Sequence, residues 1–129
     1  MSYKAAKAVI KCKNNLFLQL RDSNIRIHCP NCWAFFGGKL EKKENPAIGL
    51  IRELNEELNY LPNTIEEIYV WYNHRTYTTV HFFLIELDKK YIFNYITEGQ
   101  VGKWHKISNI PNIDIADDVN AYFRKYITE

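Results

Sequence analysis

The sequence has no long hydrophobic run and no leader-like segment. Its most apolar stretch, residues 80–87, contains His81 and Glu86 and is far shorter than the roughly 20 residues that cross a bilayer. No transmembrane helix is therefore expected. At the start of the chain, Lys4, Lys7 and Lys11 interrupt every apolar segment that could serve as the core of a secretory signal. These two absences predict a cytoplasmic protein that does not act at a membrane.

Neither sign of charge is in large excess. The chain has 17 Lys and Arg against 15 Asp and Glu, a net charge of +2, which is too small to indicate a protein that binds nucleic-acid duplexes or anionic membranes. Its 129 residues are 47% hydrophobic and 15% aromatic, enough for a real core but the size of one domain. Linkers, repeats and low-complexity tracts are absent from the sequence. We expect a single domain over residues 1–129, as a monomer or homodimer.

Cysteine is scarce and odd in number. Three cysteines do not suit a secreted domain held by disulfides, so we expect reduced thiols. Cys29 and Cys32 flank Pro30-Asn31 and look like half of a zinc site, but a structural zinc needs four ligands and Cys12 has no neighbouring cysteine. We therefore expect neither a zinc centre nor a redox pair. No Ser or Cys is placed with His and Asp as a nucleophilic unit, so acyl transfer has no support.

The order of apolar segments and turn signals predicts an α/β domain. Asn45 and Pro46 are typical of a helix start and Asn59 of a left-handed helix end, so one helix is expected over residues 46–58. A second, amphipathic helix is expected over residues 116–127. Alternating β-branched and aromatic residues predict the strands of a mixed sheet. The expected strands cover residues 5–11, 16–21, 33–36, 67–74, 78–87 and 101–107, with a possible edge strand at 91–95 and a loop at 110–113.

The first predicted helix has an acidic face. At about 100° per residue, Glu53, Glu56 and Glu57 share one wedge, on another face than the apolar stripe that faces the core. Most acidic helix faces are simply solvated. Here, however, the helix carries no Lys and its only basic residue is Arg52, so three carboxylates at spacings of three and four repel one another. Oxygen ligands of this kind suit Mg²⁺ or Mn²⁺ and not zinc.

The segment from Gly38 to Tyr60 resembles a known family signature. It reads Gly38-Lys-Leu-Glu-Lys-Lys-Glu44, then seven residues, then Arg52-Glu-Leu-Asn-Glu-Glu-Leu-Asn-Tyr60. This pattern is similar to the Nudix box of MutT-like Nudix hydrolases. Asn59 stands where the family usually has Gly, at a helix end where Asn is the next-best residue. The resemblance implies a Nudix-type α/β/α sandwich around a mixed β-sheet.

The resemblance also implies a metal site and a reaction. Family members hydrolyse a nucleoside diphosphate linked to another group, X, with Mg²⁺ or Mn²⁺ as cofactor. Glu53 and Glu57 are the leading metal ligands, with Glu56 and the Gly38 carbonyl beside them. A second stretch, Glu98-Gly-Gln-Val-Gly-Lys-Trp, resembles a loop whose glutamate approaches the metal in MutT-like members. The alternative for Glu98 is a solvent-exposed turn.

Two further roles follow from the same resemblance. The guanidinium of Arg52 is expected to orient a carboxylate of the box, either Glu44 or Glu53. A general base must lie within hydrogen-bond reach of the attacking water. Glu53, Glu56 and Glu98 are the acids that could take this role, and the sequence does not choose among them.

The substrate is less well defined. Phe35 could stack on a base and Arg21 could contact a phosphate or a base, although for the aromatic residue a place in the core is the usual outcome. Asp117 aligns with an Asn that reads oxidised guanine in MutT-like enzymes, and Phe36 replaces their Pro. Both departures count against 8-oxo-dGTP, because a charged Asp lacks the donor and acceptor pair of an amide.

Three functions remain open. The favoured one is a pyrophosphohydrolase that converts a nucleoside triphosphate to a monophosphate and pyrophosphate. The second is a hydrolase of nucleotide sugars or other NDP-X compounds. The third is a domain that only binds a nucleotide as a sensor, which would be favoured by missing box carboxylates. All four box glutamates are present.

Overall fold

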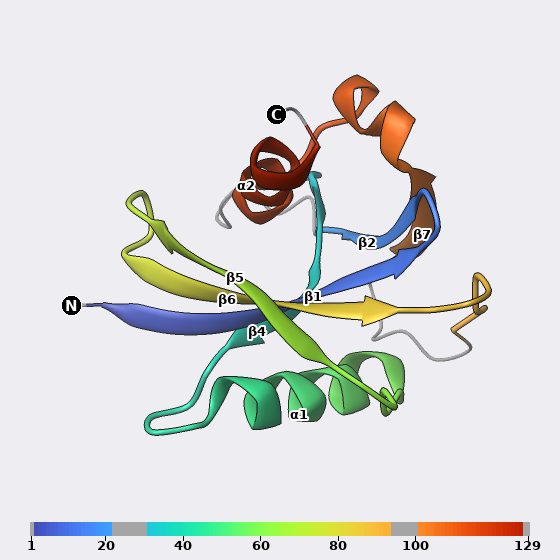
Figure 1. Ribbon diagram of the computed structural model, residues 1–129. Coiled ribbons are helices and arrows are strands. Elements are labelled where there is room, and N and C mark those ends of the chain that lie inside the picture. The colour runs from blue at the N-terminus through green and yellow to red at the C-terminus, as the bar shows by residue number, and fades with distance from the viewer. Residues whose placement is uncertain (1, 22–30, 94–100, 128–129) are drawn as a thin grey trace.

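The computed structural model describes residues 2–21, 31–93 and 101–127 of the chain. These residues form a mixed sheet with a helix on each side of it (Figure 1). The fold class predicted from the sequence, an α/β/α sandwich around a mixed β-sheet, is confirmed. The elements are β1 (Tyr3–Cys12), β2 (Asn15–Leu20), β3 (Trp33–Ala34), β4 (Phe36–Lys39), α1 (Pro46–Leu58), β5 (Glu66–Asn73), β6 (Thr78–Glu86), β7 (Val101–Lys106), the 3₁₀ helix η1 (Ile107–Asn112) and α2 (Asp117–Tyr126).

Strand β1 is the centre of the sheet. It pairs in parallel with β6 along one edge and antiparallel with β4 and then β2 along the other. The main strand order is β3-β2-β1-β6-β5, and β7 adds to β2. The parallel pair is joined through α1 and β5, which places strands far apart in sequence beside each other. Strands β1 and β4 pair with each other beside α1.

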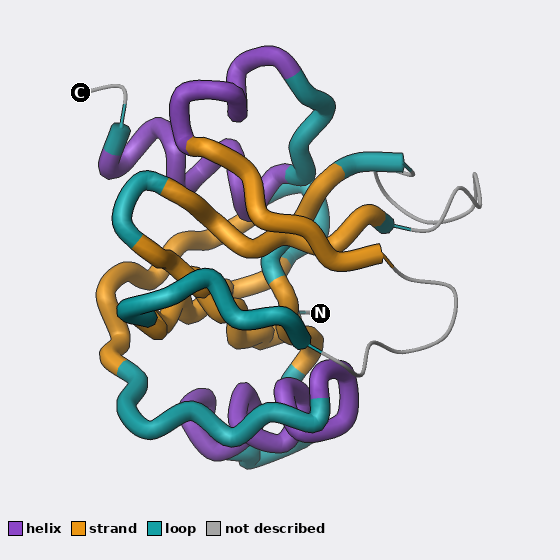
Figure 2. The backbone as a smooth tube through the Cα atoms, turned by 90° about the vertical axis from the view of Figure 1, so that its right-hand side faces the viewer, coloured by secondary structure: helices purple, strands orange, loops and turns teal. Residues whose placement is uncertain are grey.

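The two helices bury opposite faces of this sheet, as both views show (Figures 1 and 2). Because side chains alternate along a strand, even-numbered residues of β1 such as Ala6 and Ala8 pack with Leu50 and Leu54 of α1. The odd-numbered Val9 belongs to the second core, which contains Val119 and Tyr122 of α2. The acidic wedge of Glu53, Glu56 and Glu57 therefore lies on the helix that covers the first of these two faces.

Two local predictions are wrong. Residues 110–113 were expected to form a loop, but Ile107–Asn112 is a 3₁₀ helix that includes Pro111 and ends with the Ile113 amide donating to the Ile110 carbonyl. A short 3₁₀ turn loses little by containing a proline, because few of its amides have partners. The expected edge strand is not seen at Tyr91–Phe93, and its last two residues lie outside the described ranges. Instead, the Tyr91 carbonyl accepts a hydrogen bond from the Trp104 indole at 2.9 Å.

The cysteines differ from one another. Cys12 is a buried free thiol, as expected. Cys32 is disulfide-bonded, so the prediction of a reduced thiol is wrong for this residue. Cys29 lies outside the described residues.

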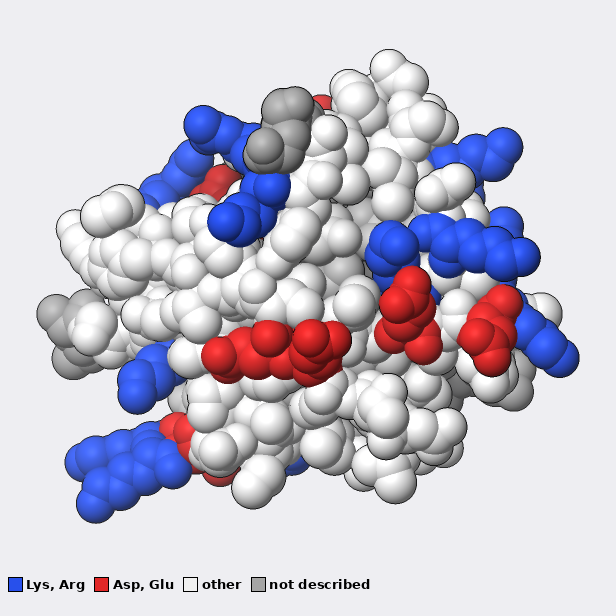
Figure 3. Space-filling model, in the orientation of Figure 1, with Lys and Arg blue, Asp and Glu red and all other residues white. Residues whose placement is uncertain are grey.

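Charge is spread over the surface. On the face shown in Figure 3, Lys and Arg side chains gather in separate groups, with smaller groups of Asp and Glu between them. This face therefore carries both signs, in keeping with the net charge of +2. Among the helices of the described ranges, none has the length and apolar character needed to cross a membrane.

Candidate active site

The ends of α1 are fixed by two asparagines. Asn45 accepts hydrogen bonds through its side chain from the amides of Ala47 and Ile48, at 2.9 and 3.2 Å, and Pro46 occupies the first turn. Asn59 ends the helix in the left-handed conformation, at φ 50° and ψ 43°. The substitution of Asn for the family's Gly therefore leaves the helix end intact, because Asn tolerates this geometry better than other residues with a side chain. Both predicted caps are confirmed.

Arg52 connects three glutamates. Its Nε and a terminal nitrogen donate to the two oxygens of Glu44 at 2.8 and 3.0 Å. The other terminal nitrogen lies 3.3 Å from Glu53 Oε1 and 3.2 Å from Glu56 Oε1. The Arg52 hydrogen bonds are the main reason why the pKa of Glu44 is lowered to about 2. Of the two partners predicted for Arg52, the structure shows both, with the bidentate geometry at Glu44.

Two glycines bring β4 against the acidic wedge. Gly37 has φ +133°, and a Cβ there would collide with the carbonyl oxygen of Ala6, so the position accepts only glycine. Its amide donates to Glu57 Oε1 at 3.2 Å. A Cβ on Gly38 would lie 3.1 Å from the carboxyl group of Glu53. The backbone of the glycine pair therefore meets Glu53 and Glu57 at close range.

The two carboxylates that face the glycines are electrostatically strained. Burial, followed by the charge of Glu53, raises the pKa of Glu57 to about 7. Burial also raises the pKa of Glu53, against the opposing charge of Arg52. Glu56 differs from both because its side chain is 58% exposed. A cation beside Glu53 and Glu57 would relieve their repulsion and desolvation.

The donor set fits a hard divalent cation. Carboxylate oxygens together with a backbone carbonyl are the ligands that Mg²⁺ and Mn²⁺ take in proteins. In the part of the chain that the structure describes, no three His, Cys, Asp or Glu side chains converge as a ready-made metal cluster. The fit therefore rests on Glu53, Glu57 and the adjoining backbone of Gly38.

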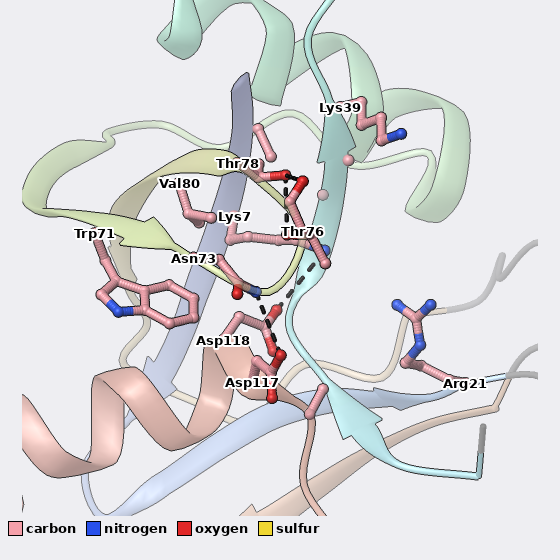
Figure 4. Close-up of a pocket in the computed structure, with 14 residues that line it drawn as sticks. Lys7, Arg21, Lys39, Trp71, Asn73, Thr76, Thr78, Val80, Asp117 and Asp118 are labelled. Atoms are coloured by element: carbon pink, nitrogen blue, oxygen red, sulfur yellow. Dashed lines mark hydrogen bonds and ion pairs between the residues drawn. The ribbon is translucent and has the colours of Figure 1, made fainter. Parts of the chain in front are cut away.

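A cavity of about 500 Å³ opens on the other side of the glycine pair. Its volume is in the range of pockets that hold small molecules. It runs from β4 along β1 to the hairpin between β5 and β6 and to the first turn of α2 (Figure 4). The lining includes Gly37, Gly38, Lys7, Arg21, Trp71, Asn73, Asp117 and Asp118. The glycine pair that meets Glu53 and Glu57 thus also lines a pocket that reaches the start of α2.

Asp117 is tied to the hairpin. Its Oδ2 accepts a hydrogen bond from the Asn73 amide at 3.3 Å and lies 3.4 Å from Arg75 Nε. The Asn73 side-chain oxygen in turn accepts from the Arg75 backbone amide at 2.9 Å. These contacts hold Asp117, the first residue of α2, at the rim of the pocket.

Asp118 is the buried acid of the pocket. Its Oδ1 accepts a hydrogen bond from the amide of Val119 at 2.7 Å, while its Oδ2 has no hydrogen-bond partner among the described residues. Lys7 Nζ lies 3.7 Å from this second oxygen. Burial raises the pKa of Asp118. The charge of Lys7, hydrogen bonds from the backbone amides of Val119 and Phe35, and the charge of Arg21 oppose the shift.

Phe35 does not lie where the sequence suggested. It has no exposed surface, and its ring meets Phe82 and Tyr122 edge to face. Because it falls between β3 and β4 with its side chain in the α2 core, it cannot stack on a ligand. The prediction is wrong, and Trp71 is the aromatic residue that lines the pocket instead.

The other residues predicted for the site are Arg21, Glu98 and the residues of the Nudix-like box. Arg21 lines the pocket, and its Nε is buried without a hydrogen-bond partner within the described ranges; its contact with a substrate stays a prediction. Glu98 lies outside the described residues, so its role stays a prediction. The structure brings together the box residues Gly38, Glu44, Arg52, Glu53, Glu56 and Glu57.

Lys7 was not singled out as a site residue from the sequence. Its signal is that a lysine occupies an inward position of a strand whose neighbours, Ala5 to Ile10, are otherwise all buried. Period-two alternation places Lys7 on the same side as Val9, facing α2. Asp118 carries a similar signal, since a second acid follows Asp117 on the face that the amphipathic helix turns inward.

Comparison with known proteins agrees with this arrangement. The NUDIX domain family model matches residues 2–123. The chain is 41% identical over 54 residues to an 8-oxo-dGTP diphosphatase of Proteus vulgaris; the match covers 42% of the chain and 46% of that protein. The chain thus spans about half the length of this curated relative.

Two solved structures show the same fold. The MutT NUDIX hydrolase of Burkholderia pseudomallei superposes with a TM-score of 0.82 at 15% identity, over 98% of each chain. The NUDIX domain of Shewanella oneidensis NrtR, solved with ADP ribose, gives a TM-score of 0.73 at 17% identity, over 99% of this chain and 90% of the other. With the family model spanning nearly its whole length, the chain belongs to the Nudix family.

Proposed function

We propose that the protein is a metal-dependent hydrolase of phosphoric anhydride bonds that converts a nucleoside triphosphate to the monophosphate and pyrophosphate. One observation carries the proposal. The glycine pair of β4 borders both the strained carboxylates Glu53 and Glu57 and a cavity of about 500 Å³. A phosphate chain can therefore lie beside Glu53 and Glu57 while its nucleoside occupies the cavity.

Glu53, Glu57 and the Gly38 carbonyl would hold the cation, with Glu56 and Glu98 as additional candidates. When bound, Mg²⁺ or Mn²⁺ neutralises the phosphate oxygens and makes the attacking water more acidic. Arg52 holds the carboxylate of Glu53 at 3.3 Å and is itself anchored by Glu44. The general base is one of Glu53, Glu56 and Glu98, each an acid that could accept the proton of the water.

The side chains that line the cavity favour a nucleotide over a simple polyphosphate as the substrate. Arg21 and Lys7 supply cationic groups, Trp71 supplies an aromatic surface, and Asp118 supplies an acceptor. The curated relative is an 8-oxo-dGTP diphosphatase, which makes 8-oxo-dGTP a substrate to test. In this chain, however, the carboxylate at the position of the amide that reads oxidised guanine is engaged by Asn73 and Arg75.

A second candidate is hydrolysis of another NDP-X compound. The Nudix neighbour from Shewanella oneidensis was solved with ADP ribose, and the cavity has the volume for a larger X group. A nucleotide sensor without catalysis is a third candidate, which we rank last because every box carboxylate is retained.

The test is hydrolysis of a panel of nucleotides with separation of the products. The panel contains the common triphosphates, 8-oxo-dGTP, ADP-ribose and a nucleotide sugar, each with Mg²⁺, with Mn²⁺ and with excess chelator. We expect a monophosphate and pyrophosphate from at least one triphosphate, in the presence of metal. Turnover in chelator, or none on the whole panel with metal, would contradict the proposal.

A further inference from the structure

Strand β5 has an open edge. It is the last strand on one side of the sheet (Figure 1), and among the described residues its backbone pairs only with that of β6. The Ile68 carbonyl, at the bulge of β5, accepts a hydrogen bond from the Tyr126 hydroxyl at 2.8 Å. From Tyr69 to Asn73, the outer edge of the strand therefore presents its amide and carbonyl groups to solvent.

This edge lacks the features that usually keep an edge strand from pairing with another chain. Such strands are short, or carry Lys or Pro. At the opposite end of the strand order, β3 has two residues, and β7 carries Lys103 and Lys106. In contrast, β5 has eight residues and contains neither Lys nor Pro. Its bulge lies near its start, between Glu67 and Tyr69, so the second half of the strand is unprotected.

The side chains of this half are suited to pairing with a further strand. Tyr69 and Trp71 lie on the α2 side and pack against Phe82 of β6. Val70 and Tyr72 alternate to the other face, where they are 46% and 39% exposed. β-branched and aromatic residues stabilise a sheet when they lie opposite one another on neighbouring strands. A strand added at this edge would cover Val70 and Tyr72.

The two ends of β5 carry opposite charges. Glu66 and Glu67 begin the strand, and Arg75 follows its end in the turn to β6. Glu67 lies 3.0 Å from His81 and Arg75 lies 3.4 Å from Asp117, but both side chains remain exposed. If two β5 strands pair antiparallel, the acidic start of each lies opposite the basic end of the other. A parallel pair would instead bring like charges together.

We propose that two copies of the chain associate by antiparallel pairing of their β5 edges, around a two-fold axis at Trp71. Trp71 is the centre of the open edge 69–73. With this centre, Val70 of each copy lies opposite Tyr72 of the other, and Glu67 lies opposite Arg75. The contact is self-complementary, so it closes as a dimer with one sheet running through both copies. It involves none of the residues that would hold the metal and is independent of the proposed function.

The mass of the purified protein in solution tests the proposal. We expect sedimentation equilibrium at about 1–100 μM to show the mass of two chains. Val70→Lys should raise the Kd of the dimer at least about 10-fold, because lysine is the residue with which natural edges resist pairing. Val101→Lys is the matched control, since Val101 is an exposed valine on the edge strand β7; its Kd should equal that of the wild type. A monomeric wild type over the whole range, or a Kd that Val70→Lys does not change, would overturn the inference.

Two charge-reversed variants test the direction of pairing, and also serve if Val70→Lys does not fold. Glu67→Arg and Arg75→Glu each place like charges at both ends of the antiparallel pair, so each variant alone should associate at least about 10-fold more weakly than the wild type. Mixed together, they bring opposite charges to both ends and should form a dimer with one copy of each. Circular dichroism verifies that both variants are folded. A mixture that associates no better than the separate variants would overturn the inference.

Discussion

Arg52 donates to both carboxylate oxygens of Glu44, which lies eight residues earlier in the chain, through hydrogen bonds of 2.8 and 3.0 Å. The same guanidinium extends its remaining nitrogen to Glu53 and Glu56. Glu44 thereby fixes the orientation of Arg52, and Arg52 fixes that of Glu53. The charge of a lysine would be the same, but its single ammonium cannot make this forked contact.

We therefore expect Arg52→Lys to lower kcat by about 10- to 100-fold, the usual cost of losing a group that orients a metal ligand. Steady-state kinetics at saturating Mg²⁺ measures the effect. Arg124→Lys, on α2, is the control and should have wild-type kcat. Equal kcat in wild type and Arg52→Lys would show that the forked contact has no role in turnover.

Glu44 should make the stability of the protein depend on acid. Its pKa in the folded state is about 2, below the ordinary value of 4.5. Its stabilising contribution is therefore complete above pH 4.5 and is lost as the pH falls from 4.5 toward 2. Thermal unfolding should show a lower Tm for Glu44→Gln than for wild type at pH 7, with the difference shrinking at pH 3. A difference that does not change with pH would contradict this account.

Glu57 should change the stability of the protein with pH in the opposite direction. Its folded pKa of about 7 lies above the ordinary 4.5, so its favourable contribution is present below pH 4.5 and is lost as the pH rises through 7. In chelator at pH 8, Glu57→Gln should raise the free energy of unfolding by about 1–3 kcal/mol, and in a separate assay with Mg²⁺ it should abolish turnover. The control Glu56→Gln changes a largely exposed side chain and should stabilise far less. A destabilised Glu57→Gln at pH 8 would show that the carboxylate is not strained.

Gly49 offers a test of packing between α1 and the loop before it. Alanine normally stabilises a helix interior relative to glycine by about 1 kcal/mol. Here a Cβ would lie 2.4 Å from Leu40 Cδ2 and 2.9 Å from Glu44 Cδ. We expect Gly49→Ala to destabilise the protein by about 1–3 kcal/mol, measured by urea unfolding, whereas Asn55→Ala at an exposed position of the same helix should not. A more stable Gly49→Ala would mean that Leu40 and Glu44 yield easily.

The acidic wedge on α1 could be predicted from the sequence because its residues lie close together along the chain. Helix periodicity groups Glu53, Glu56 and Glu57, and the spacing to Gly38 is part of one continuous motif. The asparagines that begin and end α1 are equally local signals. A few residues of sequence therefore suffice to define this half of the site.

The residues that line the cavity could not be predicted in the same way. Lys7 and Asp118 are more than a hundred residues apart, and they meet because β1 is central in the sheet while α2 covers its face. Phe35 was misassigned for a related reason. Sequence alone did not show that the segment between β3 and β4 turns this ring toward Phe82 and Tyr122.

The central claim is that the carboxylates beside the glycine pair carry out metal-dependent hydrolysis, and kcat of Glu53→Gln tests it most directly. This change keeps the size of the side chain and removes its charge, so the fold should persist, as circular dichroism and Tm can verify. The account predicts a fall in kcat of more than about 100-fold with Mg²⁺, against wild-type kcat for Glu66→Gln, an exposed glutamate on β5. Near-wild-type turnover by a folded Glu53→Gln would contradict it.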